Sequence, residues 1–477
     1  MISENDRLEK NSLRSYPKGV DHTLNIIITT IMLAFGSCAV VSAEKPVDFA
    51  KEILPLLSDK CFVCHGPDTR KKDLVRLDSF EGATRDLGGY KAIDLKALSD
   101  SEIIVRMNDS DDPMPPENAE KQLTVEERKL IERWVKQGGN YAKHWAFVPP
   151  KKTSLPSKGH PIDAFVKKQF SEGVDFAVTA NNATIARRLA LVLTGLPPEP
   201  SLLEDFLNDN RVNAYERFVE QLLADPRYGE HQARYWLDAV RYGDTHGLHL
   251  DNRRGIYPYR DWVVRALNNN LPIDRFIEWQ LAGDLQSKPT TEQLIATGFV
   301  RMNPSTAEGG VIPAEFQAKN NFDRTETLGT VFLGMSMLCS RCHTHKYDPI
   351  TQTEYYQLMA FFNSTSEGPL DGNKYEYAPV IKVPKDQVSW NDWLKLTVER
   401  DELLSEAASI FNNVKSSRSD TKKKWSQSDE VARLAMVVDE NEEWKKNDLS
   451  IYNNAKALSK RIENAQKAFT TTLIAKE

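Results

Sequence analysis

Apolar residues recur at helical spacing along most of the chain, and the first region of this kind is residues 47–148. Short helices are expected there over Val47–Leu57 and Ser101–Met107. The strongest pattern covers Thr124–Gln137, because Glu127 follows Thr124 at the spacing of a capping box. Two glycines directly after this segment end the pattern. Its apolar face consists of Leu130, Ile131, Trp134 and Val135.

Residues 161–365 repeat this spacing in a longer series and predict a second, larger helical domain. Residues 149–160 are rich in proline, lysine and serine and are expected to be a linker. Leu196-Pro197-Pro198 separates two of the predicted helices. The predicted helical segments are 163–170, 184–193, 202–208, 214–224, 231–242, 261–268, 273–282, 291–297 and 322–338.

Residues 386–477 have a different character, since charge rises and glycine and proline become rare. Apolar residues recur there at heptad-like spacing, at Trp393, Leu396, Val398, Leu403 and Leu404. Long, solvated helices are expected, in a coiled-coil-like or hairpin arrangement. The predicted fold class is therefore mainly α: a small domain, a larger helical domain and long C-terminal helices.

Composition and charge limit the function classes. The chain of 477 residues is longer than a usual single domain, so two or three domains are expected. The formal net charge is −6, and the sequence has no basic stripe. This balance gives no electrostatic argument for nucleic-acid binding.

Residues 1–43 resemble a secretory signal. Arg14 and Lys18 precede an apolar run over residues 24–41, and Val41-Ser42-Ala43 resembles a small-residue cleavage site. Cys38 is expected to leave with this segment. The run is also close to the length of about 20 residues that spans a bilayer, so a retained membrane anchor is the alternative. Either outcome predicts an extracytoplasmic protein, periplasmic where the cell has that compartment.

Four of the five cysteines fall into two copies of one motif, C-x-x-C-H. The first is Cys61-Phe62-Val63-Cys64-His65 and the second is Cys339-Ser340-Arg341-Cys342-His343. This spacing is that of a c-type haem attachment site. The two thiols bond to one porphyrin, and the histidine becomes the proximal ligand of its iron. The sequence therefore predicts two covalently bound haems c.

Other ligands remain open for these motifs. A C-x-x-C pair also occurs in zinc sites and in redox dithiols. A zinc site needs two further Cys or His ligands, which the second pair could supply to the first. Haem is favoured at both motifs, because c-type haem is attached outside the cytoplasm and the N-terminal segment predicts export. Disulfides are not expected, since porphyrin would consume the thiols.

Met114 is the candidate for the opposite face of the first haem. It lies in Asp112-Pro113-Met114-Pro115-Pro116, where prolines exclude a helix and stiffen an extended loop. A rigid loop can hold a thioether against the iron, and Met/His ligation raises the reduction potential. The alternative is a methionine that fills a gap in the core. The sixth ligand of the second iron remains unassigned.

A polar stretch in the second domain, Asp244–Arg254, concentrates titratable groups. Such groups can bind a metal, supply a distal haem ligand or act in general acid–base catalysis. The alternative is a loop whose polar groups bond to one another. Its candidates are Asp244, His246, His249 and Asp251, with weaker ones at Glu308 and Asp323-Arg324; His345 is expected to support His343.

Residues 47–150 resemble the planctomycete-type cytochrome c domain. This resemblance implies a class I cytochrome c plan, with a terminal helix packed across an initial one. The residues that carry it are Cys61-Phe62-Val63-Cys64-His65-Gly66-Pro67, Leu77-Asp78, Met114-Pro115-Pro116, Leu123-Thr124, Trp134 and 144–150, which read HWAFVPP.

Residues 161–365 resemble the uncharacterised companion domain that follows this cytochrome module, which implies no particular reaction. Members usually carry a further C-terminal domain, so a short or truncated variant is expected here. The carrying segments are Leu193-Thr194-Gly195-Leu196-Pro197-Pro198, Arg234-Tyr235-Trp236-Leu237-Asp238, Asp244-Thr245-His246-Gly247, Gln280-Leu281-Ala282-Gly283-Asp284 and 342–350, which read CHTHKYDPI.

Two classes of function follow from these observations. The first is an exported, dihaem c-type cytochrome that passes electrons to or from a redox protein or a small molecule. The alternative is a haem-containing oxidoreductase acting on a carbohydrate-like substrate through the helical domain. A binding or structural role would follow if the second motif held zinc.

Overall fold

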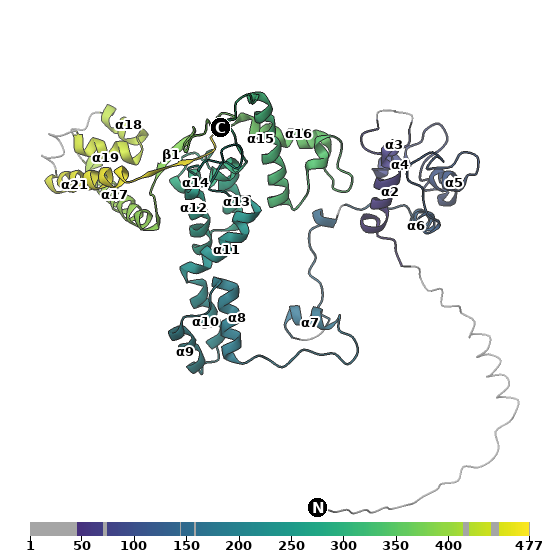
Figure 1. Cartoon of the computed structure of the whole chain (residues 1–477), viewed down its shortest axis with the longest axis horizontal. Helices are drawn as coiled ribbons and strands as arrows, with labels where there is room; N and C mark the ends of the chain where they lie inside the picture. Colours follow the sequence, from purple (N-terminus) through teal and green to yellow (C-terminus); the bar gives the residue numbers. More distant parts are fainter. Residues whose placement is uncertain are drawn as a thin grey trace, which may run out of the picture. The chain divides into compact units, whose positions relative to one another are not determined.

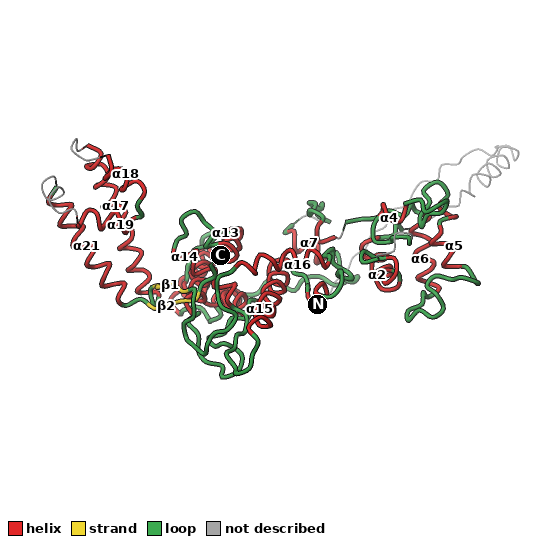
Figure 2. The backbone as a smooth tube through the Cα atoms, turned by 90° about the horizontal axis from the view of Figure 1, so that it is seen from above, coloured by secondary structure: helices red, strands yellow, loops and turns green. Residues whose placement is uncertain are grey.

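The structure, a computed structural model, describes residues 45–69, 74–143, 145–156, 159–413, 419–439 and 448–476. Within these ranges the chain is mainly helical, as predicted, with a single two-stranded sheet (Figure 2). It forms two compact units. The first runs up to Lys60 and resumes over Ser79–Ala142; the second comprises Cys61–Asp78 and the chain from Lys143 onward. The predicted signal or anchor, with Cys38, lies outside the described residues, as does His144.

The first unit is a small helical assembly. Its helices are η1 (Phe49–Ile53), α2 (Leu54–Lys60), α4 (Phe80–Thr84), η2 (Leu98–Asp100), α5 (Glu102–Asn108) and α6 (Val125–Lys136). The predicted capping box begins α6: the Thr124 hydroxyl accepts from Glu127 N (3.2 Å), and Glu127 accepts from Thr124 N (2.7 Å). The first and last helices pack together through Phe49 and Trp134, whose ring centroids are 5.5 Å apart. This contact is the packing expected of a class I cytochrome plan.

The second unit contains a helix at each segment predicted between 163 and 297 (Figure 1). Five of its helices have proline in the first turn, where the missing N–H costs no hydrogen bond. The helices are α7 (Pro161–Lys167), α8 (Asn182–Thr194), α9 (Pro200–Asn208), α10 (Ala214–Leu223), α11 (Pro226–Ala239), α12 (Tyr257–Asn268), α13 (Ile273–Ala282), α14 (Thr291–Ala296), η4 (Thr297–Arg301), α15 (Pro313–Leu328), α16 (Gln352–Phe361) and η7 (Phe362–Ser364).

Aromatic side chains fill the centre of this unit. The rings of Trp262 and Phe276 stack with centroids 5.2 Å apart and join α12 to α13. The indole N–H of Trp236 lies within 3.1 Å of Tyr259 Oη and 3.0 Å of Gln280 Oε1. Because these polar atoms are paired, the aromatic groups can be buried without an unsatisfied donor.

The helix predicted over 322–338 is not continuous. Helix α15 ends at Leu328, a π-helical turn η5 (Gly329–Leu333) follows, and Gly334 turns the chain at a φ of 64°. A Cβ built on Gly329 would lie 2.2 Å from the Met337 sulfur, so the chain folds back against this glycine. Met337 becomes buried as a result, and the second motif begins in a separate short helix, η6 (Leu338–Arg341).

The C-terminal segment forms helices α17 (Gln387–Asn413), α18 (Ser419–Gln427), α19 (Glu430–Asp439) and α21 (Leu449–Lys467). These helices bury an apolar stripe of their own, which includes Leu396, Leu404, Ala455 and Leu458. The stripe explains the heptad-like spacing: one face is solvated, and the other is a core. Among the described residues, no helix combines the length and apolarity needed to cross a bilayer.

Two strands, absent from the sequence expectation, tie this segment to the helical domain. Strand β1 (Val380–Val383) precedes α17, strand β2 (Thr470–Leu473) follows α21, and the two pair antiparallel (Figure 2). Leu473 and Ala475 then join the main core beside Trp262. The end of the chain is therefore part of the helical domain's interior.

Candidate haem attachment sites

The first motif forms one helical turn, α3 (Phe62–His65), that begins at Cys61. The amides of Cys64 and His65 both donate to the Cys61 carbonyl, at 3.2 and 2.9 Å. Residues three apart on a helix share a face, so the two thiols are neighbours. Cys64 is exposed, Cys61 is half-buried and neither is in a disulfide. The turn thus places the two cysteines close together, with Cys64 exposed and Cys61 half-buried.

His65 is held in one tautomer. Its Nδ1 lies 2.9 Å from the Val75 carbonyl oxygen, an acceptor, so Nδ1 carries the proton and donates. The lone pair therefore resides on Nε2. A metal-ligating histidine commonly donates its other ring N–H to a carbonyl in this way, which orients the ring. The backbone of Leu77 also bonds to the His65 carbonyl, at 2.8 Å.

The second motif repeats the same backbone turn. The amides of Cys342 and His343 donate to the Cys339 carbonyl at 3.2 and 3.3 Å. Both cysteines and His343 are exposed, whereas Ser340 is fully buried. The ring Nδ1 of His343 lies 2.8 Å from the carbonyl of Thr344, which again leaves Nε2 as the free ligand atom. The two motifs therefore share both a turn and a histidine tautomer.

Arg341 anchors the inner side of the second motif. Its guanidinium lies 4.2 Å above the ring of Phe322 and donates to Glu326, at 3.1 Å from Nε. Tyr355 donates its hydroxyl to the same carboxylate at 2.9 Å, and burial raises the pKa of Tyr355. Helices α15 and α16 thus hold the buried side of the motif, while its two cysteines and His343 stay exposed.

His345 shapes the loop after the motif. Its Nδ1 accepts hydrogen bonds from the amides of Asp348 (2.8 Å) and Tyr347 (3.3 Å). Its own amide donates to the Ile350 carbonyl at 2.8 Å. Sequence reasoning expected a supporting group here, and these bonds hold the chain that follows His343.

Met114 lies in the proline-rich loop of the first unit and is half-buried. Its amide donates to the Arg106 carbonyl at 2.9 Å, which fixes the backbone of this loop to α5. His65 belongs to the other compact unit, so ligation by Met114 stays a prediction. The part of the chain that the structure describes contains no cluster of three or more His, Cys, Asp or Glu side chains suited to a metal ion, as a zinc site would need.

The polar stretch Asp244–Arg254 does not bring its candidates together. Asp244 is exposed and accepts from the Tyr242 hydroxyl at 2.6 Å. Asp251 is exposed and accepts from the Gly247 amide at 2.8 Å. His249 is exposed in a left-handed turn with a φ of 55°. These contacts are those of a loop that satisfies its own polar groups, and they assemble no acid–base pair for carbohydrate chemistry.

Of the four candidates in this stretch, only His246 is buried, with 2% of its surface exposed. Its Nε2 lies 2.9 Å from the Lys374 carbonyl, and its Nδ1 faces the carboxylate of Asp371 at 3.4 Å. His246 was a candidate from the sequence, but its partner Asp371 was not predicted, because 125 positions separate the two residues.

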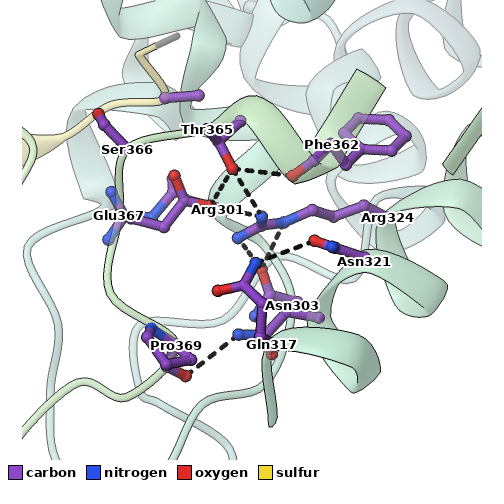
Figure 3. Close-up of polar contacts among 12 residues, drawn as sticks. Arg301, Asn303, Gln317, Asn321, Arg324, Phe362, Thr365, Ser366, Glu367 and Pro369 are labelled. Carbon is purple, nitrogen blue, oxygen red and sulfur yellow. Dashed lines mark hydrogen bonds and ion pairs between the residues drawn. The ribbon is translucent and has the colours of Figure 1, made fainter. Parts of the chain in front are cut away.

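Three buried arginines form a second feature that sequence reasoning largely missed. Arg254, Arg301 and Arg324 are at most 3% exposed, and burial lowers the pKa of Arg254 and of Arg324. Arg324 pairs with the buried Glu367 and donates to Asn303 (Figure 3). These bonds join α15 to the loop after η7. They hold backbone and partner side chains together rather than facing an open site.

Comparison with known families agrees with the predicted order of domains. Residues 61–118 match the family model described as Planctomycete cytochrome C. Residues 161–367 match the model PSCyt2, described as a protein of unknown function (DUF1549). No curated protein and no solved structure gives a significant match. The chain therefore contains a region that matches the planctomycete cytochrome c family, followed by a region that matches the DUF1549 family.

Proposed function

We propose that the chain is an exported cytochrome that carries one haem c at each C-x-x-C-H motif and transfers single electrons. The observation that carries this proposal is the shared geometry of the motifs. In both, one turn carries two cysteines that form no disulfide, and the following histidine keeps its ring proton on Nδ1. Nε2 is then the available iron ligand.

The chain's residues have separate roles in this proposal. Each thiol S–H adds across one vinyl group of the porphyrin, forming a C–S bond while the hydrogen goes to the other vinyl carbon. His65 and His343 would each hold a haem iron through Nε2, and Met114 would supply a further ligand to the first. The bound haem supplies a one-electron ferric–ferrous couple.

The proposed partners are a redox protein or a small-molecule donor or acceptor outside the cytoplasm. Export is supported by the charged and apolar pattern of residues 1–43, with membrane association through residues 24–41 as the alternative to cleavage. The cytochrome family match supports the haem chemistry.

The experiment is a pyridine haemochrome spectrum measured against protein concentration, with the chain produced in a host that matures c-type cytochromes. Two haems per chain are expected. The double variants C61S/C64S and C339S/C342S should each retain one haem, and the control variant C38S should retain two. A wild-type protein without covalent haem would contradict the proposal, and one haem would confine it to a single motif.

A further inference from the structure

Asp68 and Thr344 join the loops that follow the two attachment motifs. The Asp68 carboxylate accepts from the Thr344 amide at 2.9 Å and from its hydroxyl at 2.7 Å, so both carboxylate oxygens are used. Asp68 lies three residues after His65, and Thr344 directly follows His343. The segment Cys61–Asp78 also belongs to the same compact unit as Thr344.

Both loops are fixed to their own motifs. On the first side, Thr69 donates its hydroxyl to the Cys64 carbonyl at 2.6 Å and its amide to the Gly66 carbonyl at 3.2 Å. On the second side, Gln352 connects the loop to the motif: its backbone amide donates to the Thr344 hydroxyl at 3.4 Å, and its side-chain amide donates to the Arg341 carbonyl at 3.3 Å. Movement of either loop would therefore displace the motif to which it is bonded.

The covalent geometry limits the separation of the two histidines. Three Cα steps of 3.8 Å, an aspartate side chain and one hydrogen bond place the Cα atoms of His65 and His343 at most about 20 Å apart. The turn around Thr69 shortens the path further. Any macrocycles attached beside these histidines would be neighbours.

We propose that Asp68 is a positioning residue that holds the two attachment motifs together, so that their haems exchange electrons directly. In this step one electron leaves the ferrous iron of one haem and reduces the ferric iron of the other, with no proton or ligand transferred. Electron transfer slows steeply as its centres separate. The inference rests on the proposed dihaem function, because it needs a haem at each motif.

The test compares D68A with wild type by two measurements. Hydrogen exchange at the Thr344 amide should be faster in D68A, since this N–H loses its acceptor. The interhaem electron-transfer rate, measured after flash photolysis or pulse radiolysis, should fall about tenfold. Loss of a charged hydrogen bond costs enough free energy to shift the equilibrium between joined and separated loops by that factor. T344V keeps the amide but loses the hydroxyl, so its rate should be intermediate.

The matched control is D86A. Asp86 also accepts two backbone N–H groups, from Gly88 at 3.0 Å and Gly89 at 2.8 Å, but within its own turn. D86A should keep the wild-type rate and the wild-type exchange at Thr344. If D68A binds two haems and keeps the wild-type electron-transfer rate and the wild-type exchange at Thr344, the proposed role of Asp68 is wrong and the dihaem proposal stands. Fewer than two haems in the wild-type protein would overturn both it and the dihaem proposal.

Discussion

The imidazole of His246 faces the carboxylate of Asp371, with Nδ1 3.4 Å from Oδ2 and both side chains at most 2% exposed. Neither atom has another hydrogen-bond partner. The other ring nitrogen, Nε2, donates to the Lys374 carbonyl at 2.9 Å. This buried pair links the Asp244–Arg254 stretch to the loop around Asp371.

This relationship predicts that the two carboxylate replacements will differ. D371A should lower the free energy of unfolding by about 3–5 kcal/mol, because it leaves a buried charge or donor unpaired. D371N should cost clearly less, since its amide N–H can donate to a neutral Nδ1 while its oxygen still accepts from the Asn373 amide. Equal losses in the two variants, measured by denaturant unfolding, would contradict a specific contact between His246 and Asp371.

The Arg324–Glu367 pair predicts strong non-additivity. Both side chains are 3% exposed, so R324M or E367L alone should cost about 3–5 kcal/mol of unfolding free energy. The double variant R324M/E367L should be less destabilised than the sum of the single changes, because it leaves no lone buried charge. A double-mutant cycle in denaturant measures this coupling, and simple additivity would argue against it.

The contact of Gly329 with Met337 predicts a steric effect. G329A places a Cβ 2.2 Å from the Met337 sulfur and should destabilise the chain by about 1–3 kcal/mol. M337A in the same chain should relieve part of that loss. G309A is the matched control, because nothing lies within 4 Å of its Cβ. Thermal unfolding of the four proteins decides, and a G329A protein as stable as wild type would show that this contact is not tight.

The start of α6 predicts an acid-sensitive contact. Partial burial acts to raise the pKa of Glu127, but hydrogen bonds from Lys60 and the Thr124 amide outweigh it and lower that pKa. A carboxyl with a lowered folded-state pKa stabilises the fold above its unfolded value of about 4.3 and loses that contribution as pH falls through the folded value. E127Q should remove this part of the pH dependence of stability. An unchanged acid profile in E127Q would disprove the assignment.

Local sequence patterns predicted much of the fold. The capping box at Thr124 and the apolar stripe through Leu130 and Trp134 specify α6 without information from distant residues. The second motif could also be recognised from the local sequence. The break at Gly334 was not predicted, because it depends on the tertiary contact between Gly329 and Met337.

Long-range pairing is what the sequence could not reveal. Strands β1 and β2 pair although the C-terminal helices lie between them in the sequence. A strand of four residues is too short for its residue spacing to predict it. The partner of His246 and the bond between Asp68 and Thr344 likewise join positions more than 100 residues apart. Such contacts are created by the fold and leave no periodicity in the chain.

The most direct test of the central claim is the intact mass of the exported protein under denaturing conditions, because only covalently bound haem remains attached. The account predicts the polypeptide mass plus two haems, and plus one haem after C339S/C342S. A mass equal to the polypeptide alone, from a host that loads other c-type cytochromes, would contradict it.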